Sequence, residues 1–204
     1  MLTAMVKRPP RRLPAGDRRR QILDRALPEF AARGFAGTGT RELAAAAGVS
    51  EPILYRHFPG KNALFAAVLA LVAARLAQAI DAALARGDTA RGRLQALADA
   101  LPTMLAQHQD ELRVLCGAAA SHADAAQAAA ARAAMTAVGG ALTRGLRDAS
   151  LRHGVDRELA AYFLLQIGLG SALLRPLCVR AVTRPGFGER IVELMVKALL
   201  PPGS

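Results

Sequence analysis

The stretch GVSEPILYRHFPGK, residues 48–61, is the part of the sequence that decides the fold. It begins with a glycine and a serine, carries a proline in its first turn and ends on Phe58-Pro59-Gly60, which predicts a short helix with a turn at each end. Val49, Leu54 and Phe58 fall on one side and are the expected inward face. An Ile, a Tyr and a His are then left outside the core, which is typical of a helix whose outer face reads the DNA major groove.

A second short helix is expected just before this stretch, over Arg41–Ala47. Thr38 and Thr40 offer hydroxyl groups that would cap its start, Gly48 ends it, and Ser50 would cap the helix that follows. Two short helices joined by such a turn predict a helix-turn-helix unit, whose second helix presents its N-terminal residues to base edges.

Helical periodicity extends over the rest of the chain. From Asp17 to Gly34 apolar residues recur at helical spacing, and Pro28 within this segment predicts a kink or a weakened turn in one helix. A long helix is expected from Lys61 to about Arg86, and later helices are expected at 89–107, 110–121, 123–152, 156–180 and 187–200.

No alternating strand pattern of useful length occurs, so the expected fold is all-α with about nine helices. We expect a disordered basic arm over residues 1–16, a three-helix helix-turn-helix domain over 17–61, and a larger helical domain over 62–204.

The charge of the chain indicates a polyanionic partner. The formal net charge is +11, and residues 1–61 carry 12 Lys or Arg against 5 Asp or Glu. Basic excess beside a helix-turn-helix unit favours double-stranded DNA. Residues 1–16 would add phosphate or minor-groove contacts, or they are a solvated tail without a role.

Other classes of protein lack their signatures in this chain. There is no GxSxG, Walker or HExxH motif, so neither an enzyme nor a resident cofactor is expected. His108, Cys116 and His122 are spaced by 8 and 6 residues, which does not favour a metal site. Two cysteines without a CxxC motif indicate a reducing cytoplasm. The apolar run 160–174 is interrupted by Gln166 and is too short to span a bilayer, so no membrane association is expected.

Residues 18–65 resemble the DNA-binding domain of the TetR family of bacterial transcriptional regulators. The resemblance covers about a quarter of the chain and follows an ordered set of residues: Ile22-Leu23, Ala26 and Phe30, then Gly34-Phe35, Thr38, Leu43-Ala44, Ala47-Gly48-Val49-Ser50, Leu54-Tyr55-Arg56-His57-Phe58 and Gly60-Lys61. It implies that Gly48 adopts the left-handed turn conformation. The implied DNA-binding residues are Thr38, Thr40, Arg41, Ser50, Glu51, Pro52, Ile53, Tyr55, Arg56, His57 and Lys61.

The resemblance also implies how these residues contact DNA. Arg41 would reach a guanine edge, and Glu51 would accept a hydrogen bond from cytosine N4. Pro52 and Ile53 would touch thymine methyl groups, while Lys61 would meet a phosphate at a helix N-terminus. The pair Tyr55 and His57 would contact backbone and sugar, or would be packed aromatics that close the small domain; Arg56 would contact a phosphate or be a solvated charge.

For the C-terminal helices the resemblance implies an inducer site and a homodimer built on the last two long helices. Side chains that would line a mostly apolar pocket are Leu101, Met104, Leu105, His108, Leu112, Leu115, Cys116, Phe163 and Gln166. Apolar residues at this spacing are more often plain core. A stripe of small and large residues over 161–173, with Gly168 and Ala172 one turn apart, would serve the dimer or packing within one subunit.

The resulting expectation is a repressor that a small apolar or amphipathic inducer releases from a roughly palindromic operator. A dimer with two-fold symmetry requires such an operator because it presents two recognition helices to one face of the DNA. A transcriptional activator of the same family is the first alternative. Sequence-indifferent DNA packaging is the second, although it leaves the large apolar domain unexplained.

Overall fold

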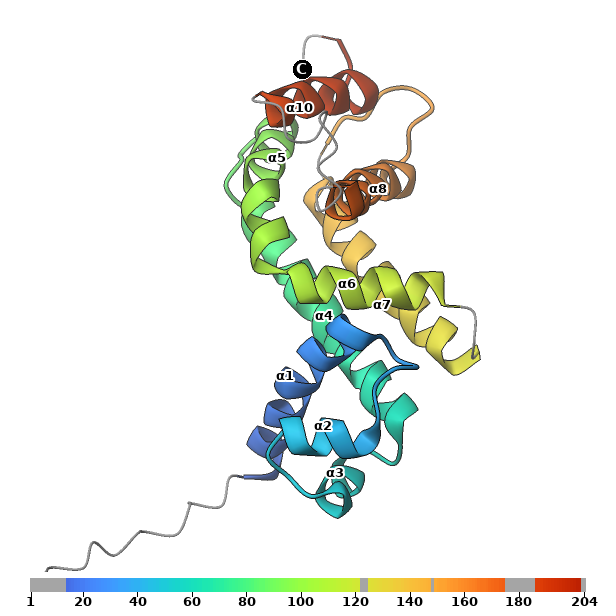
Figure 1. The fold of residues 1–204 in the computed structure, drawn as a ribbon. Coiled ribbons are helices and arrows are strands. Elements are labelled where there is room, and N and C mark those ends of the chain that lie inside the picture. Colours follow the sequence, from blue (N-terminus) through green and yellow to red (C-terminus); the bar gives the residue numbers. More distant parts are fainter. Residues whose placement is uncertain (1–13, 122–124, 148, 175–185, 203–204) are drawn as a thin grey trace, which may run out of the picture.

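The computed structural model describes residues 14–121, 125–147, 149–174 and 186–202, and every regular element within them is an α-helix (Figure 1). The predicted fold class is therefore confirmed. The helices are α1 Ala15–Arg33, α2 Thr40–Ala46, α3 Glu51–His57, α4 Lys61–Leu84, α5 Ala90–Gln107, α6 Gln109–Ala120, α7 Ala125–Gly145, α8 Arg157–Leu174 and α10 Phe187–Leu199. The expected N-terminal arm and the expected helical residues 175–180 lie outside the described residues.

The first three helices pack on one another at one end of the molecule (Figure 1). Helix α1 buries Ile22, Ala26 and Phe30 along one face and continues as one helix through Pro28, whose side chain is exposed. In α3 the buried anchor is Leu54, and Phe58 follows directly after the helix; each is 2% exposed. This inward face is the one that the apolar spacing predicted.

Helix α4 connects this end of the molecule to the remaining helices (Figure 1). It packs against α7, α5, α1 and α6, and ten of its residues are buried. Within the described residues it is the one helix long and apolar enough to cross a membrane, with a mean hydropathy of 2.1. The longest apolar stretch is thus α4 rather than residues 160–174, and packing at the centre of the fold accounts for its composition.

Most helix ends lie within one or two residues of the expected positions. The exception is α7, which ends at Gly145 rather than near residue 152. A Cβ atom at Gly145 would lie only 2.3 Å from Leu84 Cδ1, so α4 and α7 approach closely here, and a larger residue would require the Leu84 side chain to move. After α7 the chain runs through an irregular connection, with Gly154 at φ 82°, before α8 begins.

Candidate DNA interface and internal pocket

The turn between α2 and α3 is held in a fixed conformation. Gly48 adopts φ 66°, the left-handed geometry expected for it. The backbone N–H of Val49 donates to Ala44 O at 3.0 Å, and the Gln21 side chain donates to Ala47 O at 3.1 Å. The second of these bonds ties the turn to α1, so α3 has a fixed orientation on the first two helices.

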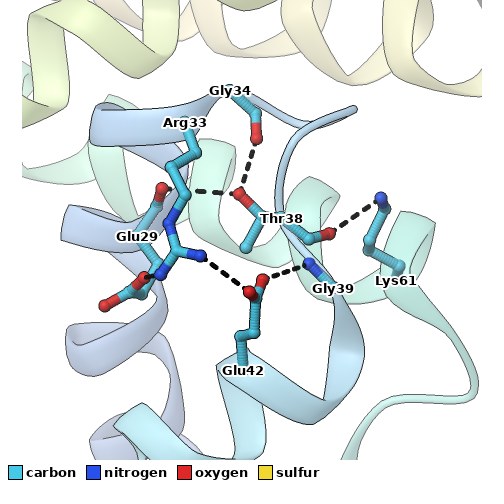
Figure 2. Close-up of polar contacts among 7 residues, drawn as sticks. All are labelled: Glu29, Arg33, Gly34, Thr38, Gly39, Glu42 and Lys61. Carbon is cyan, nitrogen blue, oxygen red and sulfur yellow. Dashed lines mark hydrogen bonds and ion pairs between the residues drawn. The ribbon is translucent and has the colours of Figure 1, made fainter.

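The start of α2 is capped by a carboxylate and not by the expected hydroxyl groups. The N-cap residue is Gly39, and its N–H donates to Glu42 Oε2 at 2.9 Å (Figure 2). Arg33 Nη1 lies 2.9 Å from Glu42 Oε1, and Arg33 also pairs with Glu29. The Gly39 hydrogen bond, followed by the charge of Arg33, lowers the pKa of Glu42 below its ordinary value.

Thr38 and Lys61 brace the loop that joins α1 to α2 (Figure 2). Thr38 is 1% exposed, and its hydroxyl donates to Gly34 O at 2.6 Å, so the side chain faces inward and away from any DNA. Lys61 Nζ donates to Thr38 O at 2.9 Å and lies 4.2 Å from the centroid of the Phe35 ring. In this structure both groups hold the loop in place.

The outer face of α3 carries a short hydrogen-bonded chain of side chains. Tyr55, which is 47% exposed, donates from its hydroxyl to Thr40 Oγ1 at 3.3 Å, and Thr40 donates to Glu51 Oε1 at 2.8 Å. Thr40 is the first residue of α2, after the N-cap Gly39, and its hydroxyl proton is directed to Glu51. Ser50 occupies the N-cap position of α3 without a side-chain hydrogen bond.

The other predicted residues of this region lie around these hydrogen-bonded side chains. Exposed side chains are Arg41, Ser50, Pro52 and Arg56, while Ile53 and His57 are half-buried. The helix is anchored from beneath by Leu54 and Phe58, each of which contributes about 1.5–3 kcal/mol on burial. The guanidinium of Arg19 lies 4.8 Å from the Phe58 ring centroid and reinforces that anchor. The structure thus gathers all predicted residues except Thr38 and Lys61 on the solvent side of α2 and α3.

Arg75 on α4 connects the N-terminal helices to the C-terminal ones. Its Nη2 lies 2.5 Å from Asp24 Oδ1 on α1, and its Nη1 lies 3.0 Å from Glu111 Oε1 on α6. Glu111 is only 7% exposed, and His108 Nδ1 lies 3.7 Å from the same carboxylate oxygen. Sequence reasoning missed this bridge because the three elements are far apart in the chain.

A cavity of about 80 Å³ lies among α4, α5, α6, α7, α8 and α10, and part of it is open to solvent. The predicted residues that line it are Leu101, Met104, Leu105, Leu112 and Leu115. His108, Cys116, Phe163 and Gln166 are not among the described residues that line it.

The positions of these four residues explain why they do not line the cavity. Phe163 and Gln166 lie on the solvent side of α8, and Gln166 donates to Tyr162 Oη. His108 lies toward Glu111. The Cys116 thiol is half-buried, and this burial raises its pKa.

Lining residues that were missed include Leu76, Ile80, Val138, Leu142, Ile191 and Met195. Their helical spacing is the same as that of plain core, so no sequence signal distinguishes them.

Helices α8 and α10 expose large apolar side chains. Leu159, Tyr162, Phe163 and Leu173 on α8 are 38–59% exposed, and Leu194 on α10 is 62% exposed. Of the predicted small-and-large stripe, Ala161 and Leu164 are buried within the subunit, while Leu165 and Gly168 line the cavity. The stripe therefore packs mainly inside one subunit.

No group of three His, Cys, Asp or Glu side chains suited to a metal ion occurs in the part of the chain that the structure describes. His122, one of the residues weighed for such a site, lies outside that part, as does Cys178.

Comparison with known proteins identifies the family. Residues 22–68 match the family model described as bacterial regulatory proteins, tetR family. The chain is 30% identical over 155 residues, 72% of its length, to the HTH-type transcriptional repressor KstR2 of Rhodococcus jostii, and covers 74% of that relative. It is 40% identical over 89 residues, 44% of its length, to the HTH-type transcriptional activator FasR of Mycolicibacterium smegmatis, and spans 41% of that protein.

The fold is shared with AibR, whose structure was solved in complex with isovaleryl coenzyme A and operator DNA. The TM-score is 0.62 at 21% identity, and the superposition covers 90% of this chain and 99% of AibR. With the family model on α1 to α3 and KstR2 matched over most of the length, the chain belongs to the TetR family and is a DNA-binding transcriptional regulator.

Proposed function

We propose that this chain is a cytoplasmic, homodimeric TetR-type repressor that a small apolar or amphipathic molecule releases from a roughly palindromic operator. Residues 17–61 form the DNA-binding domain, and residues 62–204 form the ligand-binding and dimerisation domain. The observation that carries the proposal is the outward face of α3, which holds Tyr55, Arg56 and Pro52 exposed over the buried anchor of Leu54 and Phe58.

The proposed DNA interface is formed by the start of α2 and the outer face of α3. Its residues are Thr40, Arg41, Ser50, Glu51, Pro52, Ile53, Tyr55, Arg56 and His57, with Lys61 at the margin. Thr38 is left out because its side chain is buried. Thr40 acts by holding the Glu51 carboxylate, which can only accept hydrogen bonds and so favours the amino group of cytosine over guanine O6.

Repression is favoured over activation because the alignment with the repressor covers more of this chain than the alignment with the activator does. The repressor KstR2 aligns with 72% of this chain, well into the C-terminal helices, whereas the activator FasR aligns with 44%. Activation is the second candidate, supported by the higher identity to FasR. A reporter gene placed behind the operator distinguishes them, because deletion of the regulator raises transcription if it represses and lowers it if it activates.

The proposed dimer buries the exposed apolar side chains of α8 and α10. Side chains such as Tyr162, Leu173 and Leu194 are more than half exposed in the single subunit, and an apolar surface of this kind is typical of a protein interface. A two-fold axis through this surface places two copies of α3 at one end of the dimer, where they can read the two halves of a palindrome.

The proposed switch is a shift between two conformations of the dimer. A ligand in the cavity contacts α4, α5 and α6 together, and Arg75 joins α4 to Asp24 of α1 and to Glu111 of α6. A ligand that prefers one arrangement of these helices therefore alters the spacing of the two α3 helices.

Selection of binding sites from random duplex DNA by the purified full-length chain tests the proposal. An enriched inverted repeat supports it. Binding that depends on salt but shows no preferred sequence indicates DNA packaging and contradicts it.

A further inference from the structure

The lining of the internal cavity defines the chemistry of its occupant. All 18 lining residues within the described part of the chain are Leu, Ile, Val, Met, Ala or Gly. None of these side chains carries a hydrogen-bonding group or a charge, and none is aromatic. Ligand pockets usually contain a few polar groups that fix the orientation of the ligand, so the aliphatic lining of the described residues restricts the chemistry of what can bind.

Gln166 and His108, two polar side chains on the helices around the cavity, lie outside its lining. Gln166 on α8 donates to the hydroxyl of Tyr162 on the solvent side of that helix. His108, at the junction of α5 and α6, has its Nδ1 3.7 Å from the Glu111 carboxylate, and Glu111 in turn pairs with Arg75. A charged or hydrogen-bonding group placed in the cavity would lose its water and would gain no partner from the described lining side chains.

We propose that the cavity binds a flexible aliphatic hydrocarbon chain, an inference that rests on the proposed role of this protein as a ligand-controlled regulator. The polar group of the ligand stays at the opening of the cavity, where solvent reaches it. Met104 of α5 and Met195 of α10 are unbranched and adaptable, and they fit a chain that bends better than a flat ring. Recognition then depends on shape and chain length.

Gly168 of α8 offers a way to fill the cavity without displacing the backbone. It is one of the lining residues, and a Cβ atom built there has no neighbour within 4 Å. The variant Gly168→Leu therefore projects its side chain into open space. Gly117 of α6 is an exposed helical glycine outside the lining with equally open surroundings, so Gly117→Leu is the matched control.

The experiment titrates the full-length protein with 1-butanol, 1-hexanol and 1-octanol by calorimetry. The apolar lining predicts that each added methylene strengthens binding by about fourfold until the cavity is full. Gly168→Leu should weaken 1-octanol binding at least tenfold, whereas Gly117→Leu should bind it as the wild type does. Octanoate shows whether the natural ligand carries a carboxylate. Equal affinity for octanoate and 1-octanol indicates a carboxylate-bearing chain, and weaker binding of octanoate indicates a chain with a neutral polar group.

Three results would overturn the inference: affinity independent of chain length, unchanged 1-octanol binding in Gly168→Leu, or tighter binding of the rigid aromatic 2-naphthol than of 1-octanol. Binding to the selected operator is measured on the same protein samples without alcohol. If operator binding is intact and no alcohol binds, only this inference fails. If no specific DNA is bound, the proposed function fails whatever the alcohols do.

Discussion

At the residue scale, the side chains that hold the recognition helix in shape are as informative as those that face the DNA. Glu51 is a carboxylate beside a polyanion, a position that electrostatics disfavours unless the group has a specific partner. The Thr40 hydroxyl, 2.8 Å away, fixes one oxygen of that carboxylate. In the proposed interface the other oxygen accepts from a base.

Loss of the Thr40 hydroxyl should relax base selection at one position of each half-site. In Thr40→Val the carboxylate of Glu51 is no longer oriented, so discrimination there should fall by about 1–3 kcal/mol, the range for one well-placed base contact. Site selection followed by competition binding measures this. Thr40→Ser keeps a hydroxyl and should retain the preference. Unchanged discrimination in Thr40→Val would refute the positioning role of Thr40.

The capping carboxylate of α2 predicts a pH dependence of stability. The pKa of Glu42 is lowered in the folded chain, so its contribution is present above its ordinary value of 4.5 and is lost as the pH falls through the lower folded value. Glu42→Gln should therefore unfold at lower urea concentration than the wild type at pH 7, and the two midpoints should converge below pH 4.5. A constant difference at all pH values would contradict this cause.

Sequence alone identified Leu54 and Phe58 as the anchor because helical periodicity reports burial directly. It placed Thr38 on the outside because a threonine before a helix usually caps it. The structure buries Thr38, whose hydroxyl donates to Gly34 O four residues earlier in the chain. The true cap was visible as a glutamate three residues after Gly39, the spacing of a capping box.

At the scale of elements, α4 joins the two functional parts of the chain through Arg75. The two ion pairs of this arginine differ in burial: the Glu111 side chain is 9% exposed and the Asp24 side chain is 40% exposed. Water screens the second pair far more than the first, so the first should carry most of the coupling.

A pair of double-mutant cycles measures that difference. The cycle of Arg75→Met with Glu111→Gln should give a coupling energy of about 1–3 kcal/mol in urea unfolding. The cycle of Arg75→Met with Asp24→Asn should give less than about 1 kcal/mol. Equal coupling energies, or a larger one for Asp24, would contradict the assignment of the α4–α6 contact as the stronger link.

The sequence predicted the helices well and their tertiary environment poorly. Strong periodicity and breakers such as Arg86-Gly87-Asp88 located the ends of α4 and α5 to within about two residues. The predicted end of α7 near residue 152 was wrong, since the helix ends at Gly145. The cavity was found only in part, because α4, α7 and α10 contribute lining that a single segment does not reveal.

At the scale of the whole molecule, the exposed apolar side chains of α8 and α10 are proposed to join two copies of the chain. A charge within that surface should break the dimer. Tyr162→Asp is expected to shift the protein toward monomer in light scattering, because the carboxylate would be buried without a partner. Ala129→Asp, on the exposed side of α7, adds the same charge elsewhere and should leave the dimer intact. A dimer that survives Tyr162→Asp unchanged would require a different interface.

The most direct test of the account is the footprint of the wild-type protein on the strongest sequence recovered by site selection. The two recognition helices of a dimer predict protection of an inverted repeat, with half-sites about one or two helical turns apart and with the same contacts in both halves. Protection of a single asymmetric site, or of all sequences alike, would contradict it.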